Sequence, residues 1–213
     1  MLEFPGVVGS LVEAASDPWL NALVPSGPEV DVAPALTALA NTGVAVFTCS
    51  ERQAQTAVAA GFTELVARQA AMGLEFPVEA EPPADVDEGV DLATLGAVND
   101  RAYDNARHEL ERTLRKLPAA DVHAYGRRLH GGTLVSVALV FDAGDDSTVQ
   151  YVATLPTARR AGHAEAVMRR ALADAAARGM RTTTLTASED GRPLYRRLGY
   201  REVGEVELRR RPC

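Results

Sequence analysis

Long apolar runs and basic leader segments are both missing from this sequence. No apolar stretch approaches the ~20 residues that a helix needs to cross a bilayer. Hydrophobic residues make up 46% and charged residues 24% of the chain, as in ordinary globular proteins. The first residues, MLEFPGVVGS, carry no basic segment ahead of an apolar stretch, as a secretory signal would. We therefore expect a cytoplasmic protein that does not associate with membranes.

Cysteine is scarce as well. Only Cys49 and Cys213 are present, far apart in the sequence and without metal-ligand spacing. Free thiols in a reducing compartment are the simplest interpretation of this pattern. We expect no bound metal ion.

Basic residues are nearly absent from the first part of the chain. Residues 1–83 contain ten acidic residues against two basic ones, Arg52 and Arg68, which gives a net charge of −8. Residues 84–213 contain 19 acidic and 20 basic residues, a net charge of +1, so that the whole chain carries −7. Nucleic-acid-binding proteins usually present a basic face, and we expect no nucleic-acid partner. The contrast between the two parts is typical of tandem domains.

Apolar spacing and turn residues predict the elements of the first part. The expected order is a helix, a short buried strand, a second helix, and two strands separated by a small-residue turn, over residues 30–40, 44–49, 51–60, 62–68 and 72–78. The segment EAEPPADVDEG that follows is rich in proline and acid, as linkers often are. We predict an N-terminal half over 1–80, a linker over 81–90 and a second domain over 91–213.

The second domain is expected to alternate helices with strands. The predicted order is one long helix ended by Pro118, three strands joined by short turns, a long helix, a strand, a short helix and a last strand, over residues 91–116, 122–129, 133–141, 148–154, 162–178, 181–187, 188–198 and 200–210. One of the turns is His130-Gly131-Gly132. Gly61-Phe62 and Gly199-Tyr200 both lie between a helix end and a strand, which indicates a duplication, although such joints are common.

The segment VQYVATLPTARRAGHAEAVMRRALADAAARGM is predicted to form a strand, a proline break, a turn and a long helix. The first amide groups of a helix lack intrahelical partners and lie at the positive end of its dipole. Backbone amides from Arg160 to Ala164 are therefore suited to hold a pyrophosphate. Gly162 would let the phosphate approach because it has no Cβ, and Arg159 or Arg160 could add a charge-assisted contact. Alone, the pattern also fits a plain strand–helix turn.

Here the sequence resembles a known family. The turn RRAGHA, residues 159–164, resembles the (Arg/Gln)-x-x-Gly-x-(Gly/Ala) signature of the GNAT superfamily of N-acetyltransferases. The block from Leu185 to Tyr200 resembles the later GNAT pattern of a strand, Ser, and Pro-Leu-Tyr-x-x-Leu-Gly-(Phe/Tyr). The resemblance covers about residues 85–213, and residues 1–80 are more loosely similar to the degenerate N-terminal half of tandem GNAT-like proteins. It implies an α+β fold, with a central mixed, mostly antiparallel sheet flanked by helices.

The resemblance also implies acetyl-CoA, or a related acyl-CoA, as the donor. The pantetheine arm would hydrogen-bond along a strand that splays from its neighbour, and a backbone amide near Val152 would polarise the thioester carbonyl. Tyr195 matches the family tyrosine that protonates the departing thiolate. The implied cofactor-binding residues are Val152, Ala153, Thr154, Arg159, Arg160, Ala161, Gly162, His163, Ala164 and Ser188.

Three residues of the turn depart from the family pattern. Arg160 replaces the usual glycine, although its amide is retained. His163 replaces a small or aliphatic residue, and either a phosphate contact or an exposed side chain fits it. Glu165 would weaken pyrophosphate binding if its carboxylate faced the phosphates.

A general base is harder to assign. His123, Tyr125 and Gln150 lie on expected strands, where each could equally have a structural role. No acidic residue falls within 148–154. We therefore expect deprotonation of the amine through ordered water, without a named base.

The resulting hypothesis is an acyl-CoA-dependent N-acetyltransferase that attacks directly within a ternary complex. A non-catalytic acyl-CoA-binding regulatory protein is the alternative, because no base is evident. A Rossmann-type nucleotide site is disfavoured, since the glycines do not follow G-x-G-x-x-G. The acceptor, a small-molecule or peptide amine, stays open, as does the choice between monomer and homodimer.

Overall fold

The computed structural model describes residues 2–9, 18–40, 42–77, 83–117, 121–129 and 131–212. Pro118, His130 and Cys213, for which the sequence suggested roles, lie outside these ranges. The chain divides into two compact units, each treated separately below. The N-terminal unit comprises residues 1–71, 187–189 and 202–213, and the second unit comprises 72–186 and 190–201.

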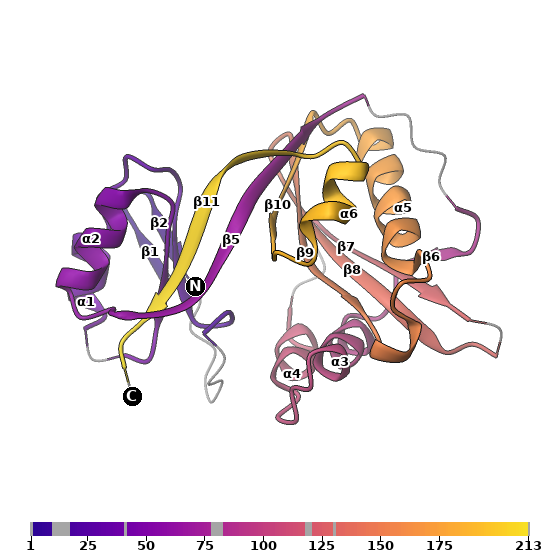
Figure 1. Ribbon diagram of the computed structural model, residues 1–213, viewed down its shortest axis with the longest axis horizontal. Helices are drawn as coiled ribbons and strands as arrows, with labels where there is room; N and C mark the ends of the chain where they lie inside the picture. Colours follow the sequence, from indigo (N-terminus) through magenta and orange to yellow (C-terminus); the bar gives the residue numbers. More distant parts are fainter. Residues whose placement is uncertain are drawn as a thin grey trace. The chain divides into compact units, whose positions relative to one another are not determined.

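The N-terminal unit combines strands with two helices (Figure 1). Its strands neighbour one another in the order β1 (Leu2–Phe4), β2 (Val7–Gly9), β3 (Ala22–Pro25), β4 (Ala45–Thr48), β11 (Arg201–Arg210) and β5 (Glu64–Glu75). β3 and β4 are parallel, whereas β11 runs antiparallel to β4. The helices are α1 (Ala33–Ala38) and α2 (Glu51–Ala59). Apolar side chains from these strands and helices form the core, among them Leu23, Val32, Leu36, Val46 and Phe62.

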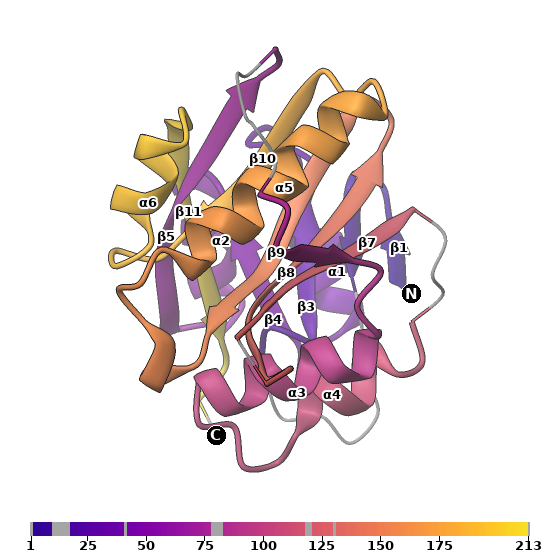
Figure 2. The same ribbon diagram turned by 90° about the vertical axis from the view of Figure 1, so that its right-hand side faces the viewer.

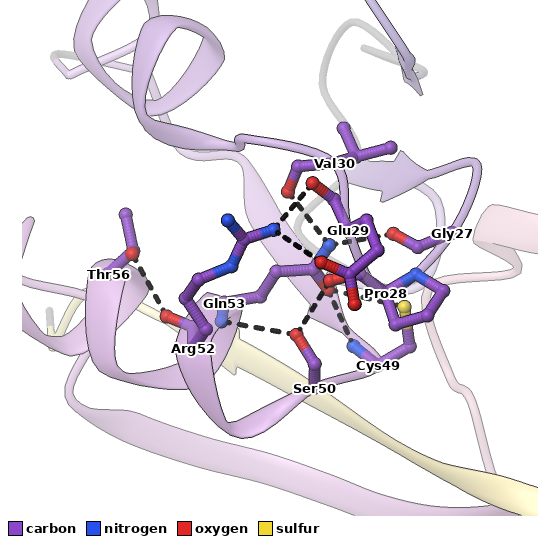
Figure 3. A network of polar contacts seen from close by, with 9 residues as sticks. All are labelled: Gly27, Pro28, Glu29, Val30, Cys49, Ser50, Arg52, Gln53 and Thr56. Atoms are coloured by element: carbon purple, nitrogen blue, oxygen red, sulfur yellow. Dashed lines mark hydrogen bonds and ion pairs between the residues drawn. The ribbon is translucent and has the colours of Figure 1, made fainter.

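A buried amide side chain fixes the start of α2 (Figure 3). The Nε2 of Gln53 donates to the carbonyls of Gly27 at 2.8 Å and Val30 at 3.0 Å. Its Oε1 accepts hydrogen bonds from the Cys49 amide at 2.9 Å and the Cys49 thiol at 3.2 Å, while Ser50 caps the helix. Because buried polar groups need such partners, the cluster accounts for packing, and Cys49 is a free thiol within it.

The second unit is built on a mixed sheet. The last residues of β5 neighbour β10 (Thr182–Ala187), which is followed by β9 (Asp146–Thr154), β8 (Leu134–Ala143), β7 (Val122–Arg128) and β6 (Val86–Glu88). β9 and β10 are parallel, and the pairs from β9 to β6 are antiparallel. The helices are α3 (Leu92–Ala102), α4 (Glu109–Leu114), the short η1 (Pro156–Ala158), α5 (His163–Ala177) and α6 (Arg192–Arg197).

Helices cover the sheet of the second unit on both faces. Residues 134–140 of β8 are all buried, which requires cover on each side of the strand. α3 and α5 both contact β8, and α5 lies across the strands in Figure 2. The predicted α+β fold, with a mixed and mostly antiparallel sheet flanked by helices, is confirmed. Within the described residues, no helix is long and apolar enough to cross a membrane.

Two predicted boundaries are wrong. Residues 64–75 form one strand rather than two, because the supposed turn at Gln69–Ala71 lacks glycine or proline and continues the alternation that buries Ala70, Met72 and Leu74. The expected single helix over 91–116 is two helices. The chain reverses after Tyr103, where Asp104 adopts a φ of 55°.

Candidate active site

Strand β9 pairs on both edges only in its first half. Asp146–Val149 pair with Thr182–Leu185 of β10, and no pairing with β10 is recorded from Gln150 onward. Pairing with β8 continues as far as Thr154. The second half of β9 therefore has one free edge, as expected for a strand that splays from its neighbour.

A bulge marks the point where the two halves meet. Val137 and Leu139 of β8 lie opposite Ala153 and Gln150, so β9 contains one extra residue there. Tyr151, within the bulge, has a φ of 52°. A bulge of this kind bends the strand and re-aims its backbone groups.

Beyond the bulge, the backbone groups alternate between the two edges. The Leu155 amide donates to the Val135 carbonyl at 2.9 Å, and the Ala153 carbonyl accepts from the Ser136 hydroxyl at 3.2 Å. Residues 153 and 155 thus face β8. The carbonyls of Val152 and Thr154 point away from β8, since they accept hydrogen bonds from the Tyr103 hydroxyl and the Arg159 guanidinium, each at 3.2 Å.

The turn after β9 exposes a series of amide groups. Arg159 is extended, Arg160 has a φ of 64° and Gly162 a φ of 75°, and α5 begins at His163. Among the described residues, no protein acceptor is recorded for the amides from Arg160 to Ala164. Left-handed residues at alternate positions direct neighbouring amides toward one point, which forms an anion-binding concavity at the start of a helix.

The side chains of the turn have different surroundings. The guanidinium of Arg159 donates to the carbonyls of Thr154 at 3.2 Å and Ala102 at 2.7 Å, so it is engaged by backbone. Arg160 is exposed. His163 is half-buried, and no hydrogen-bond partner is recorded for its Nδ1.

Glu165 is held by arginines. Its carboxylate pairs with Arg169 at 2.9 Å and with Arg197 of α6 at 3.5 Å. Hydrogen bonding to Arg169 is the main reason why the pKa of Glu165 lies below its ordinary value. Its charge is therefore balanced within the protein, which weakens the objection that it repels a phosphate.

Tyr195 lies on α6 with only 8% of its surface exposed. Its ring packs edge-on against Tyr200, with 5.9 Å between the ring centroids. Burial, reinforced by the nearby Tyr103 hydroxyl, raises the pKa of Tyr195 well above its ordinary value of 10. The phenol is consequently protonated at neutral pH.

Sequence reasoning missed Asn99 on α3 and Tyr103, the residue that caps the end of this helix. Asn99 Nδ2 donates to the Tyr151 carbonyl at 3.5 Å, and the Tyr103 hydroxyl donates to the Val152 carbonyl at 3.2 Å. The two residues are four positions apart and so lie on one face of the helix. This spacing was visible in the sequence, but nothing there indicated that the face would meet the bulge.

The base candidates have different surroundings. His123 contacts Asp142 at 3.1 Å, and the buried Tyr125 hydroxyl accepts a hydrogen bond from Arg178 at 3.1 Å, which assigns both to a structural network. Gln150 is half-buried beside the bulge.

Ser188 is exposed just after β10 and belongs to the N-terminal unit, so its cofactor role stays a prediction. The described residues contain no cluster of His, Cys, Asp or Glu that could hold a metal.

Comparisons with known proteins agree with this arrangement. Residues 147–203 match the model of the acetyltransferase (GNAT) domain. A GCN5-related N-acetyltransferase from Kribbella flavida is 23% identical, with a TM-score of 0.70, 98% of this chain covered and 87% of that chain. A putative GNAT-family acetyltransferase from Novosphingobium aromaticivorans is 18% identical, with a TM-score of 0.66 and coverages of 100% and 91%. At these identities, the solved structures establish a shared fold. A search of curated proteins gives no match.

Proposed function

We propose that this chain transfers an acetyl group from acetyl-CoA to a primary amine, because residues 147–203 match the acetyltransferase (GNAT) domain and the fold is shared with solved acetyltransferase structures. One observation carries the proposal. The free edge of β9 at Val152 and Thr154 leads into an exposed turn, residues 159–162, at the start of α5. An extended thioester arm that ends in a diphosphate has matching chemistry along its length.

The turn would hold the pyrophosphate through the amides from Arg160 to Ala164. The positive end of α5 adds to this attraction. Gly162 contributes in two ways: it adopts the left-handed conformation, and no heavy atom lies within 4 Å of the position that a Cβ would take. Because Arg159 is engaged with backbone carbonyls, we assign it to holding the turn and α3 in place and leave the charged contact to Arg160.

The chemistry would proceed by direct attack of the amine nitrogen on the thioester carbonyl carbon. The Val152 amide at the free edge would donate to the carbonyl oxygen as negative charge develops on it. As the C–S bond breaks, Tyr195 would give its proton to the sulfur. Tyr195 is suited to this role because it is protonated at neutral pH and largely buried on α6. The proton of the attacking amine would leave through ordered water.

A single substitution tests the role of Tyr195. We expect Tyr195→Phe to lower kcat by ~10²-fold or more, because a general acid contributes 10²–10⁴-fold, while the Kd for CoA stays unchanged. The measurements are thiol release over a panel of small-molecule and peptide amines and calorimetric titration with CoA. Unchanged turnover would remove Tyr195 from the mechanism. CoA binding by the wild-type protein without turnover on any amine would favour a regulatory acyl-CoA-binding protein instead.

A further inference from the structure

Two side chains donate hydrogen bonds to the carbonyl oxygens on the free edge of β9. The Tyr103 hydroxyl donates to Val152 at 3.2 Å, and the Arg159 guanidinium donates to Thr154 at 3.2 Å. An added strand would direct its own N–H groups at these same oxygens. The edge is therefore not simply open, because side-chain donors stand where a ligand's amides would bind.

Tyr103 and Arg159 differ in how firmly they are held. Arg159 has a second bond, at 2.7 Å, to the Ala102 carbonyl. The Tyr103 hydroxyl has a single recorded hydrogen bond, and 64% of the residue is exposed to solvent. The Tyr103 ring can thus leave the strand without opening the core, whereas Arg159 cannot leave without releasing the end of α3.

The backbone beneath Tyr103 is fixed. The Tyr103 amide donates to the Asn99 carbonyl at 3.1 Å, as the last bond of α3. The next residues turn back on the buried Asp100, whose carboxylate accepts hydrogen bonds from the Asn105 side chain at 2.8 Å and the Glu111 amide at 2.9 Å. Only the Tyr103 side chain would therefore have to move for its hydroxyl to leave the Val152 carbonyl.

We propose that Tyr103 is a gate on the free edge of β9, where acyl-CoA would bind. Its hydroxyl competes with a pantetheine amide for the Val152 carbonyl, and the side chain turns away as acyl-CoA binds. This inference rests on the proposed function and deepens it. Tyr103 is a positioning residue in this scheme and transfers no proton.

The test compares two ligands on the full-length wild-type protein and on Tyr103→Phe. CoA carries the pantetheine arm, and adenosine 3′,5′-bisphosphate lacks it. Because the substitution removes only the competing hydroxyl, we expect the Kd for CoA to fall about three- to tenfold, the worth of one ordinary hydrogen bond. The Kd for the bisphosphate should not change. Calorimetry gives both constants, and equal thermal midpoints establish that the variant is folded.

The other possible results overturn either the gate or the proposed function. An unchanged or weaker affinity of Tyr103→Phe for CoA overturns the gate, since the hydroxyl then does not compete or instead contacts the ligand. An equal gain for both ligands also overturns it, because the effect would not depend on pantetheine. If the wild-type protein binds neither CoA nor acetyl-CoA, the proposed function itself falls, and that result is distinct from loss of the gate alone.

Discussion

Arg160 combines a strained backbone with an exposed side chain. Its φ of 64° lies in the left-handed region, where a side chain costs about 1–2 kcal/mol relative to glycine. Strain of this kind is often kept where a backbone group has to point in a particular direction. Arg160 lies in the turn just before α5, where the proposed function needs backbone amides to face a diphosphate. The backbone strain at Arg160 therefore fits the anion site that we propose at this turn.

Replacing Arg160 by glycine should make the protein more stable. We expect a gain of about 0.5–1 kcal/mol in the free energy of unfolding, because relief of the strain exceeds the greater freedom of glycine in the unfolded chain. Ala161→Gly is the matched control: Ala161 has no positive φ, so this variant should lose about 0.5–1 kcal/mol. Chemical denaturation measures both. Equal losses in the two variants would show that the conformation of Arg160 is not strained.

At the scale of elements, helix ends explain why much of this chain could be predicted. α2, α5 and α6 each end at a left-handed glycine, namely Gly61, Gly179 and Gly199. The amides of Phe62, Met180 and Tyr200 then donate to carbonyls five residues earlier, at 2.9–3.1 Å. Glycine at such positions can be recognised in a sequence, and the predicted C-terminal ends of these helices lie within one residue of those observed, whereas α6 begins at Arg192 rather than at residue 188.

Other features depend on contacts that no local pattern shows. The break after Tyr103 is made by the Asp100 carboxylate bonding to amides at the start of α4, and the only local signs are Asp104 and Asn105. The close approach of α3 to α4 requires Gly96, since a Cβ there would lie 2.5 Å from the Glu111 Cα. The turn at 159–164 was predicted because a glycine and a helix start are local signals. The hydrogen bond from Tyr103 to Val152 joins residues 49 positions apart, and it was not predicted.

The β7–β8–α5 region contains a charge network centred on Asp142. Its carboxylate accepts hydrogen bonds from Arg178 at 2.7 and 3.1 Å and from Ser147, and it contacts His123 at 3.1 Å. Burial would raise the pKa of Asp142, but the bonds from Arg178 and Ser147 outweigh it and hold the pKa below its ordinary value. Folding therefore favours the ionised form of Asp142. Its carboxylate links β7 and β8 to Arg178 at the end of α5.

Asp142→Asn should destabilise the protein by about 2–3 kcal/mol at pH 7, because Arg178 then loses its partner in a partly buried site. A lowered pKa in the folded state contributes stability above about pH 4, and this contribution is lost as the pH falls further. The difference between variant and wild type should accordingly shrink between about pH 5 and pH 3. Unfolding free energies measured across this range test the sign. Asp145→Asn, which affects an exposed pair with Arg181, should cost under about 0.5 kcal/mol.

On the scale of the whole molecule, the two ends of the chain fold together in one unit. Arg211 lies 3.9 Å from the centroid of the Phe62 ring and donates to the carbonyls of Ala60 at 3.2 Å and Leu39 at 3.5 Å. Ion pairs of Glu64 with Arg210 and of Arg68 with Glu207 join β5 to β11. The last strand therefore completes the N-terminal unit, although residues 190–201 just before it belong to the second unit. Neither unit is a continuous segment of the sequence.

We expect one continuous surface, from Val152 through Ala164, to bind CoA through its backbone groups. Amide chemical shifts of the ¹⁵N-labelled full-length protein, recorded as CoA is added, test this most directly. We predict that the largest shifts fall on Val152, Thr154 and the amides from Arg160 to Ala164, with little change at the Gln53 network of the N-terminal unit. Shifts concentrated elsewhere, or no binding at millimolar CoA, would contradict the account.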